Sequence, residues 1–121
     1  FIDILIANRA KIKRYGCPVG TLTGELAKLN HEARGAANGL FTLFRRWLAR
    51  QFAAAGLKDD ADALALHLLA RSQGVATLAN AFRDEKFIRA EVQLMHDWLD
   101  ACLSGKAPAK GPVRQRPAWQ R

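Results

Sequence analysis

Residues 60–82 read DADALALHLLARSQGVATLANAF, and this stretch decides how the rest of the chain must be arranged. Its length and period predict an α-helix. Apolar residues, however, occupy most of the helix circumference, and such a helix must be covered on two sides. In a chain of 121 residues, one side meets the chain's own core, and a partner chain most simply covers the other. Two adjacent stripes run along the helix, and all of their members except Arg71 are apolar. One contains Leu64, Leu68, Arg71, Val75, Leu78 and Phe82, and the other contains Leu66, Leu69, Ala70, Ala76 and Ala79.

The rest of the sequence predicts four more helices and no strand, so the fold class is all-α. The predicted helices span residues 1–15, 18–29, 31–55, 60–82 and 85–103. The last one is also apolar over more than one face. Its main stripe is Ile88, Val92, Met95, Leu99 and Cys102, and a second set widens it: Phe87, Leu94 and Trp98.

Composition indicates one globular domain, residues 1–103, followed by a basic tail, residues 104–121. Half of the residues are hydrophobic and a quarter are charged. The net charge of +8 is concentrated in the tail, so the folded part is only mildly basic and lacks the charge expected of a DNA-binding surface. The proline, glycine and alanine of the tail predict a flexible segment.

Two cysteines are too few for a disulfide framework, which favours reduced thiols and a cytoplasmic protein. No apolar run reaches the roughly 20 residues of a membrane span, and no signal peptide is recognisable. The chain begins at Phe1, inside a predicted helix, and therefore reads as part of something longer.

Three short sequence strings and one helix, in a fixed order, relate the chain to a known family. Tyr15-Gly16-Cys17-Pro18-Val19-Gly20-Thr21-Leu22 is followed by Gly24-Glu25-Leu26-Ala27, and later by the helix of Trp47 and by Gln73-Gly74-Val75-Ala76-Thr77-Leu78-Ala79. This ordered set resembles the C-terminal regulatory domain of TetR/AcrR-family transcriptional repressors over about residues 1–103.

The resemblance implies a helical domain with a pocket for a small effector between its helices. It also implies a homodimer in which the last two long helices of each chain form a four-helix bundle. The two-sided apolar character of residues 60–82 and 85–103 leads to the same arrangement independently. The N-terminal helix-turn-helix domain with which the family reads operator DNA is absent from these residues.

A mostly apolar pocket with a few polar anchors is the usual form of an effector site. The aromatic residues of the first and third helices either line such a pocket or pack in an ordinary core. His67 and Arg71, one turn apart, are polar anchors for a ligand or partners of other side chains. The residues expected to bind the effector are Tyr15, Leu22, Leu26, Phe41, Phe44, Trp47, His67 and Arg71.

Glycine in the middle of a helix costs about 1 kcal/mol relative to alanine, so Gly74 calls for a reason. Close approach of another helix, from a partner or from the same chain, would supply one. The residues expected at the dimer interface are Ala70, Gly74, Thr77, Leu78, Met95, Trp98 and Leu99.

Other site chemistry is weakly indicated. Cys17 is either a thiol sensor or a structural residue in a turn. His96 and Asp100 share a helix face but have no third ligand at metal-site spacing, so neither a metal nor another cofactor is predicted. No catalytic motif is present, so the chain is not expected to be an enzyme.

The sequence thus predicts the sensing and dimerising half of a transcriptional repressor. One alternative is a helical module that docks a different protein through its last two helices. A weaker one is nonspecific nucleic-acid binding through the basic tail.

Overall fold

The computed structural model describes residues 1–20, 25, 28 and 31–105, and the fold below refers to these residues. Every regular element in them is helical, which confirms the all-α prediction. Residues 18–20 are also helical, but most of the predicted helix 18–29 and the basic tail beyond residue 105 lie outside the described residues. The bounds are α1 Asp3–Ala7, α2 Arg9–Tyr15, α4 His31–Ala54, the short 3₁₀ turn η1 Lys58–Asp60, α5 Ala61–Phe82 and α6 Glu85–Leu103.

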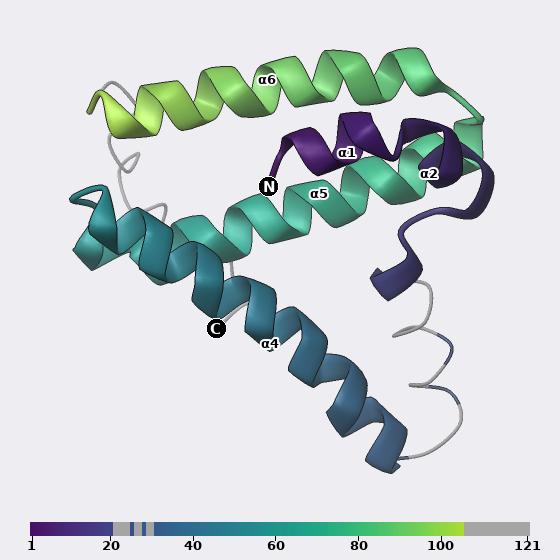
Figure 1. The fold of residues 1–121 in the computed structure, drawn as a ribbon, viewed down its shortest axis with the longest axis horizontal. Coiled ribbons are helices and arrows are strands. Elements are labelled where there is room, and N and C mark those ends of the chain that lie inside the picture. The colour runs from purple at the N-terminus through teal and green to yellow at the C-terminus, as the bar shows by residue number, and fades with distance from the viewer. Residues whose placement is uncertain (21–24, 26–27, 29–30, 106–121) are drawn as a thin grey trace, which may run out of the picture.

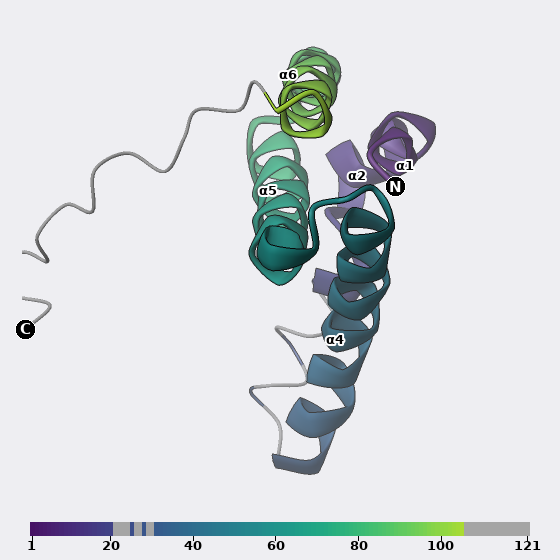
Figure 2. The same ribbon diagram turned by 90° about the vertical axis from the view of Figure 1, so that its left-hand side faces the viewer.

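The helices form two layers (Figures 1 and 2). α5 and α6 run side by side in one layer, and α1, α2 and α4 cover the same face of that pair. α4 crosses the first half of α5, and its N-terminal part extends away from the body. The opposite face of the α5–α6 layer has none of the described helices against it. One long side of α5 is therefore covered by this chain and the other is not.

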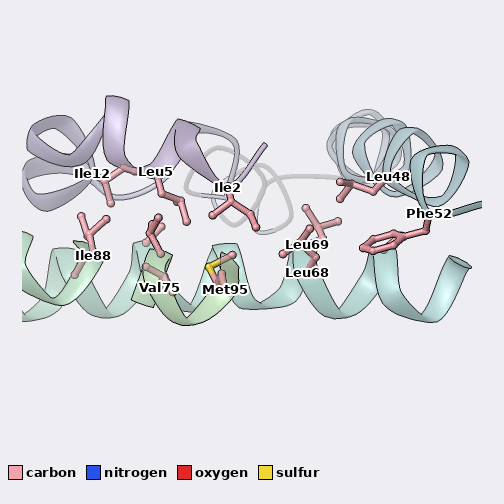
Figure 3. Packing of buried hydrophobic residues seen from close by; sticks show 14 of the residues in the cluster. Ile2, Leu5, Ile12, Leu48, Phe52, Leu68, Leu69, Val75, Ile88 and Met95 are labelled. Atoms are coloured by element: carbon pink, nitrogen blue, oxygen red, sulfur yellow. The ribbon is translucent and has the colours of Figure 1, made fainter. Parts of the chain in front are cut away.

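The core lies between the two layers (Figure 3). Ile2, Leu5 and Ile12 point from α1 and α2 toward α5 and α6, and Leu48 and Phe52 of α4 extend the cluster along α5. Ile88 and Met95 are the largest fully buried side chains of this core. The buried side of α5 is made by Ala61, Ala65, Leu68, Leu69, Ser72, Val75, Ala76 and Ala79.

The predicted helix 1–15 is divided in two by Asn8. The backbone of Asn8 has φ −107° and ψ 13°, outside helical values, and its side-chain Nδ2 donates a hydrogen bond to the Ile4 carbonyl at 2.9 Å. Asparagine favours such local bonds over a regular helix. The break lets α1 lie along α6 while α2 packs against both α5 and α6.

The α5–α6 junction is set by two consecutive residues. Asp84 caps α6 by accepting hydrogen bonds from the backbone N–H groups of Lys86 and Phe87 at 2.9 and 3.2 Å. Arg83 ends α5 in the left-handed conformation, φ 54° and ψ 42°, which usually favours glycine.

The side chain of Arg83 offsets this backbone strain with hydrogen bonds that connect α5 to α2. Arg83 Nη1 donates to the carbonyls of Lys13 and Arg14 at 3.1 and 2.7 Å, and Asn80 Nδ2 also donates to Lys13 at 3.1 Å. These carbonyls belong to the last turn of α2, where no intrahelical donor is left for them. The C-terminal ends of the two helices are thus joined.

A second tie links α4 to the start of α5. Arg45 donates from Nε and Nη2 to the two carboxylate oxygens of Asp62, at 2.8 and 2.6 Å. The hydrogen bond from Arg45 lowers the pKa of the Asp62 carboxyl. Both groups face water, so this pair positions α4 more than it stabilises the fold.

Substitution of Arg83 separates backbone strain from hydrogen bonding. Arg83→Ala should lower the free energy of unfolding by about 1 kcal/mol, because it loses the bonds to α2 and keeps the strained backbone. Arg83→Gly should be more stable than Arg83→Ala by about 1 kcal/mol, because glycine accepts positive φ. Urea denaturation at one fixed protein concentration measures both values. Equal free energies of unfolding for the two variants would show that the backbone at residue 83 is not strained.

Candidate functional site

A cavity of about 290 Å³ lies between the two layers, close to the junction of α2 with the Gly16–Gly20 segment. We call it the Phe44 cavity. Most of its wall is hydrocarbon, and its volume is at the lower end of the range for small-molecule sites. Its lining residues are Phe1, Ile4, Leu5, Asn8, Lys11, Ile12, Cys17, Pro18, Val19, Phe44, Leu69, Ser72, Gln73 and Ala76.

Few polar groups face this cavity, and most of them are already engaged. The Ser72 hydroxyl donates to the Leu69 carbonyl at 2.7 Å, and Gln73 Nε2 donates to the Cys17 sulfur at 3.4 Å. Lys11 is the charged residue of the lining, and no acidic residue is among the lining residues. The cavity therefore suits an apolar molecule that is neutral or carries a hydrogen-bond acceptor or negative group near Lys11.

Both glycines of the Gly16–Gly20 segment stand at positions where a larger residue meets a constraint. Gly16 has φ 76° and ψ −166°, a combination that side chains other than hydrogen disfavour strongly. Gly20 lies under the carboxamide of Gln73: a Cβ at residue 20 would come to 2.3 Å from Gln73 Oε1. Gln73 thus spans Cys17 and Gly20 from α5 and holds this wall of the cavity in place.

The expected effector residues are only partly gathered here. Phe44 lines the cavity, in ring contact with Phe1 at 6.3 Å between centroids. Phe41 is half-buried and packs against the core, outside the lining. Tyr15 is exposed, with the Arg14 guanidinium 5.3 Å from its ring centre. Leu22 and Leu26 lie outside the described residues.

His67 and Arg71, expected to anchor a ligand, have other contacts. The His67 ring lies 4.9 Å from the Trp98 ring, centroid to centroid, away from the cavity. Arg71 donates to Glu91 of α6 at 2.7 Å. Both residues therefore connect α5 with α6, and neither belongs to the lining.

Trp47 lines a second cavity, of about 330 Å³, at the other end of the α4–α5 contact. We call it the Trp47 cavity. Its wall combines the start of α1, the end of α4 and the end of α6, and Phe1 separates it from the Phe44 cavity. Its lining residues are Phe1, Ile2, Asp3, Trp47, Leu48, Gln51, Phe52, Ala55, Leu68, His96, Leu99 and Leu103.

On the side of α5 and α6 that no other described helix covers, several apolar side chains are exposed. Leu66 and Leu78 are 45% and 43% exposed, and Leu94 of α6 is 51% exposed. Leu94 lies between Glu91 and Trp98 on its helix, three residues after one and four before the other, so it shares their side of α6. We define the outer face as Leu66, His67, Ala70, Gly74, Thr77, Leu78, Leu94 and Trp98.

The predicted interface residues divide between this face and the interior. Ala70, Gly74, Thr77 and Leu78 are exposed on the outer face, and Trp98 lies half-buried at its edge. Met95 is completely buried in the core and has no surface for a partner, and Leu99 lines the Trp47 cavity on the other side of α6. Met95 therefore leaves the interface set, whereas the place of Leu99 in an interface stays a prediction.

Sequence reasoning passed over other residues. Leu66 and Leu94 belong to the outer face, and Leu69, Ser72 and Ala76 belong to the α5 wall of the Phe44 cavity. Gln73, which also lines this wall, is a candidate polar anchor for a ligand on sequence grounds, with the same standing as His67 and Arg71. Helical spacing could have separated the two faces of α5. Residues 66, 70, 74 and 77 fall on the outer face, and residues 69, 72 and 76 fall on the cavity wall. Asn8 and Lys11 gave no signal, because polar residues on a short helix are common.

The described residues contain no group of three or more His, Cys, Asp and Glu that could hold a metal ion. The nitrogen Nε2 of His96 lies 2.7 Å from an Asp3 oxygen rather than beside Asp100. In the same part of the chain, no helix has the length and hydrophobicity needed to cross a membrane.

Residues 4–93 match the family model of the C-terminal domain of LmrA/YxaF-like transcriptional regulators, which belong to the TetR group. The chain belongs to this family. The match covers α1 to the middle of α6, including the Phe44 cavity and most of the outer face. A search of curated proteins gives no match. The chain is therefore a regulatory domain of a TetR-like transcription regulator, and this family membership points away from catalysis.

The two thiols of the domain have different surroundings. Cys17 is half-buried at the edge of the Phe44 cavity, with the Gln73 amide as its partner. Cys102 is buried near the end of α6, and burial raises the pKa of its thiol. The thiolate is the reactive form, so both access and pKa disfavour Cys102.

We expect N-ethylmaleimide to modify Cys17 at least about tenfold faster than Cys102 in the folded domain. Mass spectrometry of the peptides from a timed reaction gives both rates. Cys17→Ser is the matched control, and it should leave only the slow reaction. Equal rates in the native protein would show that Cys17 is not accessible from the cavity.

Proposed function

We propose that this domain senses a small, mostly apolar effector and forms a homodimer, in a cytoplasmic regulator that reads DNA with a helix-turn-helix domain outside this chain. Effector binding would favour one arrangement of the dimer and so change the spacing of two DNA-binding heads. If the protein is a repressor, as we propose, effector binding would release it from its operator DNA.

One observation carries the proposal: one side of α5 lines a cavity, and no other described helix covers its opposite side. Leu69, Ser72, Gln73 and Ala76 line the Phe44 cavity, while Ala70, Gly74 and Leu78 are exposed on the other side of the helix. A ligand in the cavity and a partner on the outer face would therefore touch the same helix. An equilibrium shifts only when a ligand contacts the two arrangements differently, and a shared rigid helix provides that difference.

Gly74 supports self-association on the outer face. A Cβ added at Gly74 would meet no atom of the described chain within 4 Å, and the residue is exposed. Packing within the chain therefore gives no reason for a helix-weakening glycine. Close approach of a partner helix at Ala70 and Gly74 would give one, with Leu66, Leu78 and Leu94 buried around it.

The Phe44 cavity is the better effector site of the two. Its walls come from α1, α2, α4, α5 and the Gly16–Gly20 segment, so a ligand there would contact both layers. Its α2 wall, Lys11 and Ile12, comes just before Lys13 and Arg14, whose carbonyls Arg83 joins to α5. Movement of α5 would thus be passed to α1 and α2 at the start of the chain.

Self-association is tested with two leucines that are both exposed on helices. We expect the wild-type domain to sediment as a dimer and Leu78→Glu to raise the dimer Kd at least about 100-fold, because an unpaired carboxylate would be buried in the interface. Leu43→Glu on α4 is the matched control, since Leu43 is 62% exposed and far from the outer face. It should leave the dimer intact.

A folded, monomeric wild type at all concentrations would end the dimer proposal. The outer face would then belong to a different protein, which is the alternative function for this fold. A dimer that survives Leu78→Glu but not Leu43→Glu would place the interface on α4.

Two aromatic residues one turn apart on α4 test the effector site. The fluorescent probe 1-anilinonaphthalene-8-sulfonate is apolar with one negative group and suits the Phe44 cavity. Phe44→Ala should weaken its binding about tenfold through lost apolar contact, whereas Trp47→Ala should change it less than about twofold. Ala76→Leu, which fills the cavity from α5, should also abolish binding. Unchanged affinity in folded Phe44→Ala and Ala76→Leu would exclude this cavity.

A further inference from the structure

We propose that the Trp47 cavity is the docking site of the end of this same chain, and that the indole ring of Trp119 occupies it. We call residues 106–121, which lie outside the described residues, the C-terminal strap. Docked in this way, the strap would close the cavity to other apolar guests and hold the end of α6 against α1 and α4. The inference depends neither on an effector in the Phe44 cavity nor on a dimer.

The rim of the Trp47 cavity keeps large apolar side chains in contact with water. Trp47 and Leu103 are 44% and 51% exposed, although both line the cavity. Apolar surface continues inward to Phe52 and Leu68, which are buried. At about 330 Å³ the cavity is large enough for an aromatic side chain. An aromatic ring that enters from the rim would therefore remove this apolar surface from water.

The described part of the chain ends at this rim. Leu103 is the last residue of α6 and lines the cavity, and Gly105 lies two residues beyond it. Gly105 has φ 72°, a value that favours glycine and lets the backbone turn as it leaves the helix. The strap therefore begins beside the cavity and does not have to cross the domain to reach it.

The composition of the strap leaves one large ring without a core of its own. Trp119 is its only aromatic residue, and Val113 is its only other large apolar side chain besides proline. Three of the four prolines of the chain are in the strap, and proline disfavours helix and favours an extended backbone. A segment of this composition cannot cover an indole ring by itself. Another part of the protein has to supply that cover.

The length of the strap permits the contact. Trp119 comes 14 residues after Gly105, and a flexible chain of this length spans roughly 20 Å on average. Attachment at the rim gives the ring an effective concentration on the order of millimolar at the cavity. A contact too weak to hold a separate peptide would therefore be occupied within one chain.

Charge favours the same end of α6. The strap carries five basic residues and no acidic one. Asp100 is exposed on α6, four residues after His96 and three before Leu103, so it shares the side of the helix on which these two line the cavity. The last carbonyls of α6 add partial negative charge, and the lining contains no lysine or arginine. The strap thus meets a rim of complementary charge.

Nuclear Overhauser effects in the chain of residues 1–121 locate the Trp119 ring directly. We expect contacts from its ring protons to the methyl groups of Leu99 and Leu103 and to the ring of Trp47. In a mixture of ¹³C-labelled and unlabelled chains, isotope filtering separates contacts within one chain from contacts between chains. The expected contacts should appear only within one chain.

Leu103→Ser and Leu94→Ser are matched variants, because each removes a leucine of α6 that is 51% exposed. Leu103→Ser should lower the intensity of the Trp119 contacts at least about threefold through lost apolar surface, and Leu94→Ser should lower it less than about 1.5-fold. In the strap, Trp119→Ala should make hydrogen exchange of the amides of residues 101–103 about threefold faster, because the last turn of α6 is no longer covered. Val113→Ala is the control and should leave these rates unchanged.

The proposal is overturned if the Trp119 ring contacts only its neighbours in sequence, or if Trp119→Ala leaves exchange at the end of α6 unchanged. Contacts with Leu66 or Leu94 would place the ring on the outer face, and contacts with Phe44 would place it in the other cavity. Contacts found only between chains would assign the strap to a second copy. Each of these three results also overturns the proposal.

Discussion

α5 has apolar side chains on both of its long sides, and the described helices of the chain cover only one of them. Ala65, Leu68 and Ala79 are buried against α1, α2 and α4, while Leu66 and Leu78 remain nearly half exposed. At about 25 cal/mol for each Å² of apolar surface kept from water, such a face favours association strongly. The rest of the architecture follows from this helix, because α6 lies beside it, α2 and α4 pack on its inner side, and α1 lies along α6.

Polar side chains fix what apolar packing leaves adjustable. Gln73, Asn80 and Arg83 extend from α5 toward α2 and the residues after it. Gln73 donates a hydrogen bond to the Cys17 sulfur, Asn80 donates to the Lys13 carbonyl, and Arg83 donates to the Lys13 and Arg14 carbonyls. Apolar contacts alone would let α2 slide along α5, since they have no preferred direction. Directional bonds at two points set the position of the Gly16–Gly20 segment and therefore the shape of the Phe44 cavity.

Helix content, most helix bounds and the two-sided character of α5 could be predicted from the sequence, because they depend on local spacing. α6 was predicted at its observed bounds, 85–103, and α4 within one residue of its end. The break at Asn8 was missed, because its cause is a side-chain bond to Ile4 that a hydrophobic pattern does not record.

The assignment of individual site residues was harder for a physical reason. The pattern shows that a residue is apolar on a helix but not which neighbour faces it. Met95 and Leu94 are adjacent and equally apolar, yet one is fully buried and the other 51% exposed, because the angular position of α6 relative to α5 decides between them. The partners of His67 and Arg71 lie on α6, about 20 to 30 residues away, where local spacing carries no information.

The division of α5 into two faces also limits how a ligand can act. A helix of 22 residues with intact backbone bonds moves as a unit, so pressure on Leu69 or Ala76 from inside shifts Ala70 and Gly74 outside. Small residues tolerate little displacement, because close helix contact there depends on a narrow gap. A guest that moves α5 outward would therefore disturb the tight part of the outer face before the leucines around it. Under the proposed function, Gly74 would then be the position at which a ligand inside the domain and a partner outside it influence each other most directly.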